Sequence, residues 1–179
     1  MLGWKSCAGG LMPKAAATVH GVLCDTSYFI RWAKPNEALH PAAHEYLKFL
    51  VEGGHELYVS TIALAEYAVR DSIANLPLRY FRVLPFNIDH AQRAGEFARA
   101  VFEARKNLPV QLEQRAVVAN DTKLFAQADV VPAITHYLTA DRECEKVFTL
   151  LKSVVTPDFQ FVHLSTPWHQ TFGHLNLPT

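Results

Sequence analysis

The chain has 179 residues, of which 50% are hydrophobic and 19% are charged. This size and composition fit one globular domain with a substantial core and exclude a disordered chain. The 17 basic and 17 acidic residues balance, which excludes a globally basic nucleic-acid-binding protein but leaves room for a local basic rim.

Strand and helix signals alternate along the sequence. Strands are expected at residues 20–26, 56–60, 81–86, 133–140 and 159–164. Helices are expected at 40–52, from 61 to about 75, and at 89–106, 113–129 and 142–153. Thr61 is expected to cap the second of these helices. The alternation predicts an α/β sandwich around a mostly parallel sheet.

The predicted organisation is an irregular segment at 1–18, one folded domain at 19–165 and a C-terminal tail at 166–179. Cys7, Cys24 and Cys144 are too few and too widely spaced for a disulfide framework, so reduced thiols in a cytoplasmic protein are expected. No apolar run approaches the ~18 residues of a transmembrane helix, and the N-terminal apolar stretch is too short for a signal peptide.

Four carboxylates lie in apolar surroundings: Asp25, Glu66, Asp121 and Asp141. Asp25 and Asp141 each end a predicted strand and precede a helical segment, Glu66 lies near a helix start, and Asp121 lies on an apolar helix stripe that includes Val117. A buried charge is costly unless it is paired or binds a metal. Ligands of open α/β sheets bind beyond the carboxyl ends of strands. Together the four acids favour one crevice neutralised by a divalent cation.

Each acid also has an explanation that requires no shared site. Asp25 and Asp141 fit ordinary helix caps, and Asp121 fits a cap after a helix break at Asn120. Glu66 fits a solvated or ion-paired helix residue. The shared site is favoured because four separate explanations are needed otherwise.

The order of four short motifs resembles that of PIN-domain ribonucleases, and most closely the VapC-like toxins of type II toxin–antitoxin pairs. The motifs are Asp25-Thr26-Ser27, Ser60-Thr61 followed by Ala65-Glu66, Asn120-Asp121 leading into Ala126-Gln127-Ala128, and Thr139-Ala140-Asp141. The resemblance covers residues 20–165, most of the chain. It implies a PIN-like three-layer α/β/α sandwich and a metal-dependent endoribonuclease.

The resemblance also implies roles for individual residues. Asp25, Asp121 and Asp141 are expected to bind Mg²⁺ or Mn²⁺, and Glu66 to complete the acidic set. Thr139 is expected to orient Asp141 or a metal-bound water, and Thr26 or Ser27 to contact the metal shell or a phosphate. Glu143, where the sequence departs from the family pattern, is expected as an auxiliary acid after Asp141. A metal-activated water would then hydrolyse the RNA phosphodiester bond. The implied partners are RNA, a cognate antitoxin and a second copy in a homodimer.

Basic and aromatic side chains near the expected cleft have two interpretations each. Arg31, Lys34, Lys123 and Arg142 fit either RNA-phosphate contacts or solvated surface charge. Tyr28, Phe29 and Trp32 fit base stacking, core packing or an apolar strip on which an antitoxin helix docks.

Three other functions compete with a nuclease. A catalytically silent PIN-like domain that binds RNA or protein is the main alternative. A phosphatase-like enzyme is disfavoured because Asp25-Thr26-Ser27 lacks a second Asp. His40 and His44 have the i, i+4 spacing of zinc ligands, but a metalloprotease Glu and a third ligand are absent from the motif.

Overall fold

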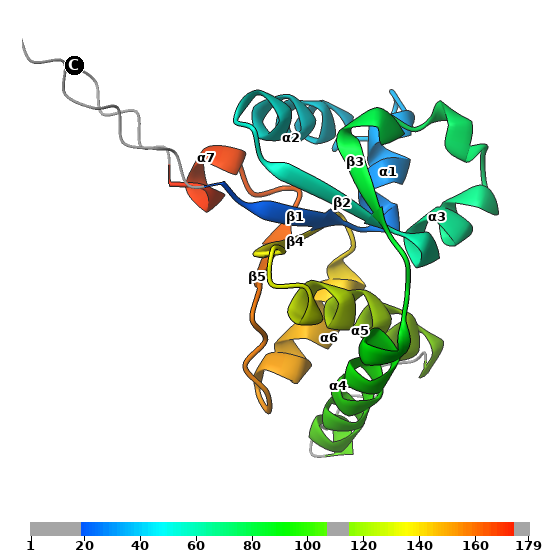
Figure 1. The fold of residues 1–179 in the computed structure, drawn as a ribbon, viewed down its shortest axis with the longest axis vertical. Coiled ribbons are helices and arrows are strands. Elements are labelled where there is room, and N and C mark those ends of the chain that lie inside the picture. Colours follow the sequence, from blue (N-terminus) through cyan, green and yellow to red (C-terminus); the bar gives the residue numbers. More distant parts are fainter. Residues whose placement is uncertain (1–18, 107–114, 174–179) are drawn as a thin grey trace, which may run out of the picture.

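The computed structural model describes residues 19–106 and 115–173, and for 115–119 only the backbone (Figure 1). The predictions for residues 1–18, for Cys7, for the helix start at 113, for the Val117 side chain and for residues 174–179 lie outside the described parts. None of the described helices is both long and apolar enough to cross a membrane. Cys24 and Cys144 are free and buried.

Within the described residues one sheet holds five parallel strands in the order β3-β2-β1-β4-β5. The strands are β1 (Gly21–Cys24), β2 (Glu56–Ser60), β3 (Phe81–Leu84), β4 (His136–Thr139) and β5 (Gln160–His163). The chain builds outward from β1 to β3 and then crosses to the other side of β1 to form β4. The strand order therefore reverses between β1 and β4, which is the switch point where ligands of such sheets bind.

Helices cover both faces of the sheet (Figure 1). One layer contains α1 (Thr26–Ala33), α2 (His40–Glu52) and α3 (Thr61–Ala68), and the other contains α4 (Ile88–Lys106), α5 (Arg115–Val130) and α6 (Arg142–Lys152). A short α7 (Trp168–Thr171) packs near α2, and 3₁₀ turns lie at Ile73–Asn75 and Leu78–Tyr80. The expected three-layer α/β/α sandwich is confirmed.

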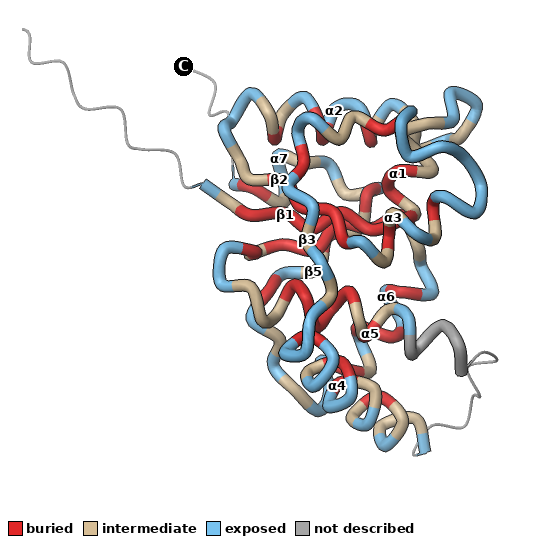
Figure 2. The backbone as a smooth tube through the Cα atoms, turned by 45° about the vertical axis from the view of Figure 1, so that its right-hand side comes forward, coloured by how far each residue is buried: buried red, intermediate tan, exposed pale blue. Residues whose placement is uncertain are grey.

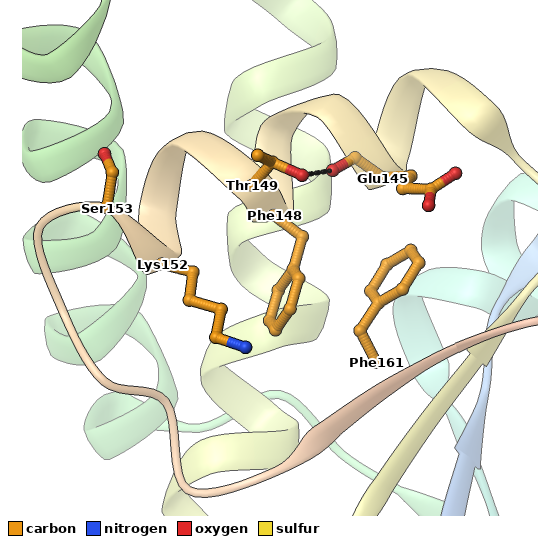
Figure 3. A pocket seen from close by; sticks show the side chains of 6 residues that line it. All are labelled: Glu145, Phe148, Thr149, Lys152, Ser153 and Phe161. Carbon is orange, nitrogen blue, oxygen red and sulfur yellow. Dashed lines mark hydrogen bonds between the residues drawn. The ribbon is translucent and has the colours of Figure 1, made fainter. Parts of the chain in front are cut away.

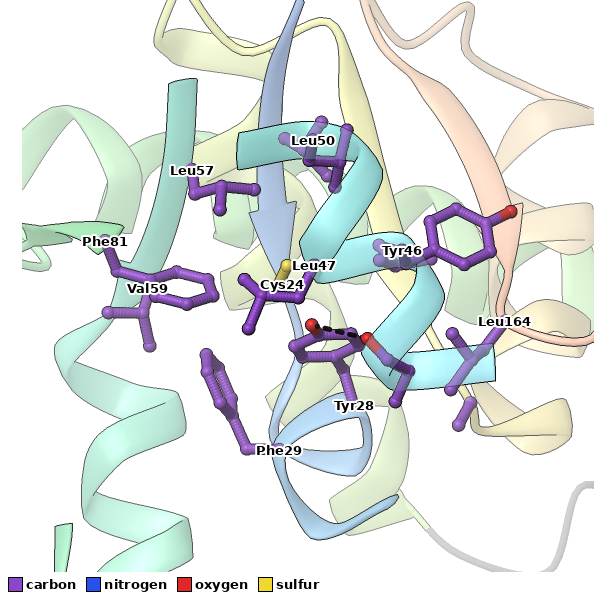
Figure 4. Packing of buried hydrophobic residues seen from close by; sticks show 14 of the residues in the cluster. Cys24, Tyr28, Phe29, Tyr46, Leu47, Leu50, Leu57, Val59, Phe81 and Leu164 are labelled. Carbon is purple, nitrogen blue, oxygen red and sulfur yellow. Dashed lines mark hydrogen bonds between the residues drawn. The ribbon is translucent and has the colours of Figure 1, made fainter. Parts of the chain in front are cut away.

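The central strands β1 and β4 are buried along their whole length because both faces are covered, whereas the edge strands β3 and β5 also carry exposed residues. Val22 and Cys24 point into the core beneath α1 and α2, whereas Leu23 points into the core beneath α4 to α6. In the tube of Figure 2 the buried segments concentrate in the strands, between the more exposed helical layers. Figure 4 shows the first core, where the buried hydroxyl of Tyr28 donates to the carbonyl of Ala43 at 3.1 Å.

The helix expected from 61 to about 75 is shorter than predicted. Ser60, not Thr61, is the N-cap, since its Oγ accepts from the Ile62 N–H at 3.0 Å. The helix ends at Ala68, and the Asp71 carboxylate accepts from the Ser72 N–H at 2.7 Å. Such local side-chain bonds compete with helix continuation, so a separate 3₁₀ turn follows.

Candidate active site

Asp25 lies directly after β1, at the edge where the strand order reverses. Its N–H donates to the carbonyl of Leu138 in the neighbouring β4 at 2.9 Å. Asp141 follows β4 at the same edge of the sheet. The expectation that these two acids share one edge therefore agrees with the strand order.

Hydrogen bonds surround the buried carboxylate of Asp25. Oδ1 accepts from the Thr26 N–H at 2.6 Å, and Oδ2 accepts from the hydroxyls of Ser27 and Thr139, each at 2.7 Å. Burial raises the pKa of Asp25, the three hydrogen bonds oppose that shift, and the nearby Glu66 adds to it. Asp25 also caps α1, so the cap explanation for Asp25 is confirmed, and it does not conflict with a shared site.

Two hydroxyl groups join the loop after β1 to the loop after β4. Thr139 Oγ1, which donates to Asp25, also accepts from the Asp141 N–H at 3.1 Å. Ser27 Oγ accepts from the Ala140 N–H at 2.8 Å. Thr139 thus touches the side chain of Asp25 and the backbone of Asp141.

Asp141 is the N-cap of α6, and its Oδ1 accepts from the Glu143 N–H at 2.8 Å. The cap explanation for Asp141 therefore holds as well. The Glu143 side chain pairs with Lys146 at 2.6 Å, and both are exposed. The auxiliary role expected for Glu143 stays a prediction.

Glu66 reaches the same edge from α3. Its Oε2 accepts from the Thr26 hydroxyl at 2.6 Å, and the side chain is half-buried. Glu66 is therefore neither a fully solvated residue nor, among the described residues, a member of an ion pair.

Asp121 lies inside α5, which runs through Asn120 without a break, so the cap explanation for Asp121 is wrong. Its Oδ2 is buried without a hydrogen-bond partner. Burial, and then the charges of Asp25, Asp141 and Glu66, raise the pKa of Asp121 to about 8. All four predicted acids thus share one electrostatic environment.

The acids are close enough to repel one another but are not gathered into a ligand shell. Within residues 19–106 and 115–173, no three His, Cys, Asp or Glu side chains form a ready-made metal-binding group. The donor types nevertheless suit a hard cation, since carboxylates and hydroxyls supply only oxygen. The unpartnered Asp121 Oδ2 is the atom that such a cation would satisfy.

Two hollows lie outside the acidic residues. The larger, of about 450 Å³, lies between α6 and β5 and is shown in Figure 3; it is lined by Glu145, Phe148, Thr149, Lys152, Ser153 and Phe161. The smaller, of about 190 Å³, lies between α1 and α3, and its lining includes Lys34, Tyr67 and Arg70. Ile30 of this lining lies one helical turn after Thr26 in α1, and Arg70 lies four residues after Glu66, so the smaller hollow lies next to these two residues of the candidate site.

The aromatic residues of α1 divide between core and surface. Tyr28 and Phe29 are fully buried, so the core explanation is correct and base stacking by them is not. Trp32 is partly buried and stacks on the His44 ring, with 5.2 Å between centroids.

The histidine pair His40 and His44 closes the end of α1. A ring nitrogen of His40 lies 3.1 Å from the carbonyl oxygen of Arg31, and one of His44 lies 3.2 Å from that of Trp32. These contacts explain the i, i+4 pair without zinc.

The predicted basic residues occupy different settings. Arg31 pairs with Glu37 at 2.8 Å, and Lys123 contacts the side chain of Asn120 at 3.4 Å. Arg142 is exposed in the first turn of α6, and Lys34 lines the smaller hollow. Lys34 and Arg142 are the better placed of the four to contact a ligand.

No family model and no curated protein matches the sequence. Among solved structures, a chain of VapBC2 from Rickettsia felis bound to a DNA fragment from their promoter matches with a TM-score of 0.55 and 16% identity. The match covers 80% of this chain and 98% of that chain. The chain therefore shares the fold of this VapBC2 chain, which agrees with the PIN-like fold expected from the sequence.

Two further solved structures match the chain at lower TM-scores. DNA-bound VapBC from Salmonella typhimurium has a TM-score of 0.49 and 20% identity, with 82% of this chain and 99% of that chain covered. VapC20 from Mycobacterium tuberculosis, a Sarcin-Ricin loop cleaving toxin, has a TM-score of 0.42 and 12% identity, with 70% and 93% covered. At 16% identity the match to VapBC2 shows the fold alone, and the activity is inferred from the site.

Proposed function

We propose that this PIN domain is a metal-dependent endoribonuclease that hydrolyses RNA phosphodiester bonds and acts as the toxin of a toxin–antitoxin pair. The observation that carries the proposal is the state of Asp121. An ionised carboxylate with a buried, unpartnered oxygen in the field of three other acids destabilises the fold unless a proton or a cation neutralises it. Perturbed acids of this kind cluster at functional sites.

Asp25, Asp121 and Asp141 are the residues proposed to hold Mg²⁺ or Mn²⁺, with Glu66 completing the set. The chemistry supplied by the bound cation would be a positive charge for phosphate oxygens and a lowered pKa for a water molecule. All four residues offer oxygen ligands, which suits these cations better than zinc or copper.

The residues of the chain prepare the site in two ways. Asp121, with a pKa of about 8, holds a proton on its carboxyl group near neutral pH and releases it when a cation takes that place. Ser27 and Thr139 hold the Asp25 carboxylate in one orientation through their hydrogen bonds to Oδ2. Ligands fixed in this way lose little freedom on binding.

RNA and an antitoxin are the proposed partners, and the cytoplasm is the proposed place of action. Lys34 and Arg70, at the hollow beside Glu66, are proposed to contact RNA phosphates. The half-buried Ile30 and Ala33 in the same hollow offer apolar contact to an antitoxin segment. The shared fold with VapBC2 supports an antitoxin partner, and a homodimer is proposed from the family resemblance.

Cleavage of RNA by the purified chain tests the proposal. Wild-type protein is expected to cut RNA with Mg²⁺ or Mn²⁺ and to stop in EDTA, whereas Asp25→Ala, Asp121→Ala and Asp141→Ala are each expected to be inactive. The exposed Glu103→Gln serves as a matched acid-removing control, since its partner is the exposed Lys106. Metal-dependent cleavage that survives all three aspartate substitutions would overturn the site.

A silent binding domain is the second candidate, and one observation favours it. The described residues contain no ready-made metal-binding group, as expected if the acids no longer bind a cation. Titration of Mn²⁺ into the protein by calorimetry separates the two functions. Absence of Mn²⁺ binding together with retained RNA or protein binding would favour the silent domain.

A further inference from the structure

We propose that Thr26 is a positioning residue that fixes Glu66 beside Asp25, so that cation binding depends on its hydroxyl group. The inference rests on the proposed metal-dependent function and deepens it. Thr26 contributes no charge and is not one of the four acids. Its role follows from the two different carboxylates that it contacts.

Thr26 donates to both carboxylates, and its hydroxyl also lies 3.5 Å from the carbonyl oxygen of Ala63. Its backbone N–H donates to Asp25 Oδ1 at 2.6 Å, and its side-chain hydroxyl donates to Glu66 Oε2 at 2.6 Å. The backbone group is fixed by the first turn of α1, and the residue is only 8% exposed. One rigid residue therefore sets the position of Glu66 relative to Asp25.

Glu66 needs such a restraint because the neighbouring charges repel it. The Glu66 carboxylate raises the pKa of both Asp25 and Asp121, so the three groups interact unfavourably when ionised. Among the described residues Glu66 has no ion pair that could hold it inward. Being half-buried, the side chain has solvent within reach if the Thr26 hydroxyl is removed.

The hydroxyl of the neighbouring Ser27 contacts different groups, so the positioning role is specific to Thr26. Ser27 Oγ donates to Asp25 Oδ2 at 2.7 Å and accepts from the Ala140 N–H at 2.8 Å, so it joins α1 to the end of β4. Thr26 joins α1 to α3. Loss of the Thr26 hydroxyl should therefore disturb Glu66 and leave the β1–β4 junction intact.

Calorimetric titration of Mn²⁺ into the full-length protein tests the role. Thr26→Val keeps the shape of the side chain and removes the hydroxyl, and it is expected to weaken Mn²⁺ binding by about 10- to 100-fold. Thr26→Ser is expected to restore most of the affinity. Thr149→Val, at an exposed threonine on α6 whose hydroxyl donates to the Glu145 carbonyl of the same helix, is expected to bind Mn²⁺ like the wild type.

Non-additivity distinguishes positioning from a general loss of structure. In a Glu66→Gln background, Thr26→Val is expected to cause little further loss of Mn²⁺ affinity, because the group that it positions is already gone. Equal losses in both backgrounds, or wild-type affinity in Thr26→Val, would overturn the inference. If Thr26→Val does not fold by circular dichroism, Thr26→Ala takes its place.

A measurement without metal keeps this inference separate from the proposed function. Carboxyl ¹³C NMR of the metal-free protein is expected to show the Glu66 signal displaced in Thr26→Val and returned in Thr26→Ser. An unchanged Glu66 signal in Thr26→Val contradicts the positioning role even if the enzyme is active. Failure of the wild type to bind Mn²⁺ contradicts the proposed function, whatever the NMR result.

Discussion

Thr139 and Asp25 are 114 residues apart in sequence, yet Thr139 Oγ1 donates a 2.7 Å hydrogen bond to Asp25 Oδ2. The same oxygen of Thr139 accepts from the Asp141 N–H, so one hydroxyl links the ends of two adjacent parallel strands. The order of strands in the sheet is what makes this contact available.

Replacement of Thr139 by Val should impair both folding and activity. Asp25 loses a hydrogen bond while it stays buried, which is expected to cost about 1–3 kcal/mol in urea unfolding and to raise the pKa of Asp25 further. Thr139→Ser retains the hydroxyl and is the matched control. Equal stability of Thr139→Val and Thr139→Ser would contradict the importance of this bond.

Asp121 should make the metal-free protein less stable as the pH rises. Its pKa is raised from 3.8 to about 8 in the folded chain, so between about pH 4 and pH 8 the folded state binds more protons than the unfolded state. Stability is therefore expected to fall across that range. Asp121→Asn should flatten the dependence and stabilise the metal-free protein by on the order of 2 kcal/mol at pH 8.

Denaturant unfolding at several pH values in EDTA measures the effect, with Glu103→Gln as the control. If the free energy of unfolding of Asp121→Asn falls with pH as steeply as that of the wild type, Asp121 is not the source of the pH dependence. Mn²⁺ should reduce the wild-type slope because a bound cation compensates the ionised acids.

His136 should make the protein less stable as the pH falls, which is the opposite of the dependence expected for Asp121. Burial, and then the neighbouring His20 and His55, lower the pKa of His136 to about 4. The unfolded chain therefore binds more protons below about pH 6.5, and stability is expected to fall as the pH drops toward 4. The His136 ring packs 4.8 Å from that of Phe172, so the α7 end of the chain should loosen first.

Replacement of His136 by Phe removes the titrating group. It should reduce the loss of folding stability at acid pH by on the order of 2 kcal/mol. Thermal unfolding between pH 4 and 7 provides the measurement. The exposed His169 of α7, changed to Phe, is the control and is expected to leave the pH profile unaltered.

Gly21 should tolerate no side chain. A Cβ at this position would lie 1.9 Å from the carbonyl oxygen of Ala133, a backbone atom that cannot rotate away. Gly21→Ala is expected to destabilise the protein by about 3 kcal/mol. Gly95→Ala is the matched control, since its Cβ would meet nothing within 4 Å inside α4, and it should stabilise the helix by about 0.5–1 kcal/mol.

Local sequence patterns predicted most of the elements. The helix at His40–Glu52 and the strand at Glu56–Ser60 have the predicted bounds, because Pro41 and the Gly53-Gly54 pair fix the helix ends and apolar periodicity fixes its face. The predicted C-terminal end of the helix from Thr61 was wrong. Asp71 and Ser72 accept hydrogen bonds from nearby backbone N–H groups there, and composition does not reveal these bonds.

The sequence by itself determined that Asp25 and Asp141 end buried strands, because strand ends are local features. Only the tertiary structure decided that those strands are neighbours, that the Thr26 hydroxyl reaches Glu66, and that Asp121 has a buried oxygen without a partner. These facts depend on chain segments 40 or more residues apart. Their cause is the packing of whole helices against the sheet, which no short stretch of sequence encodes.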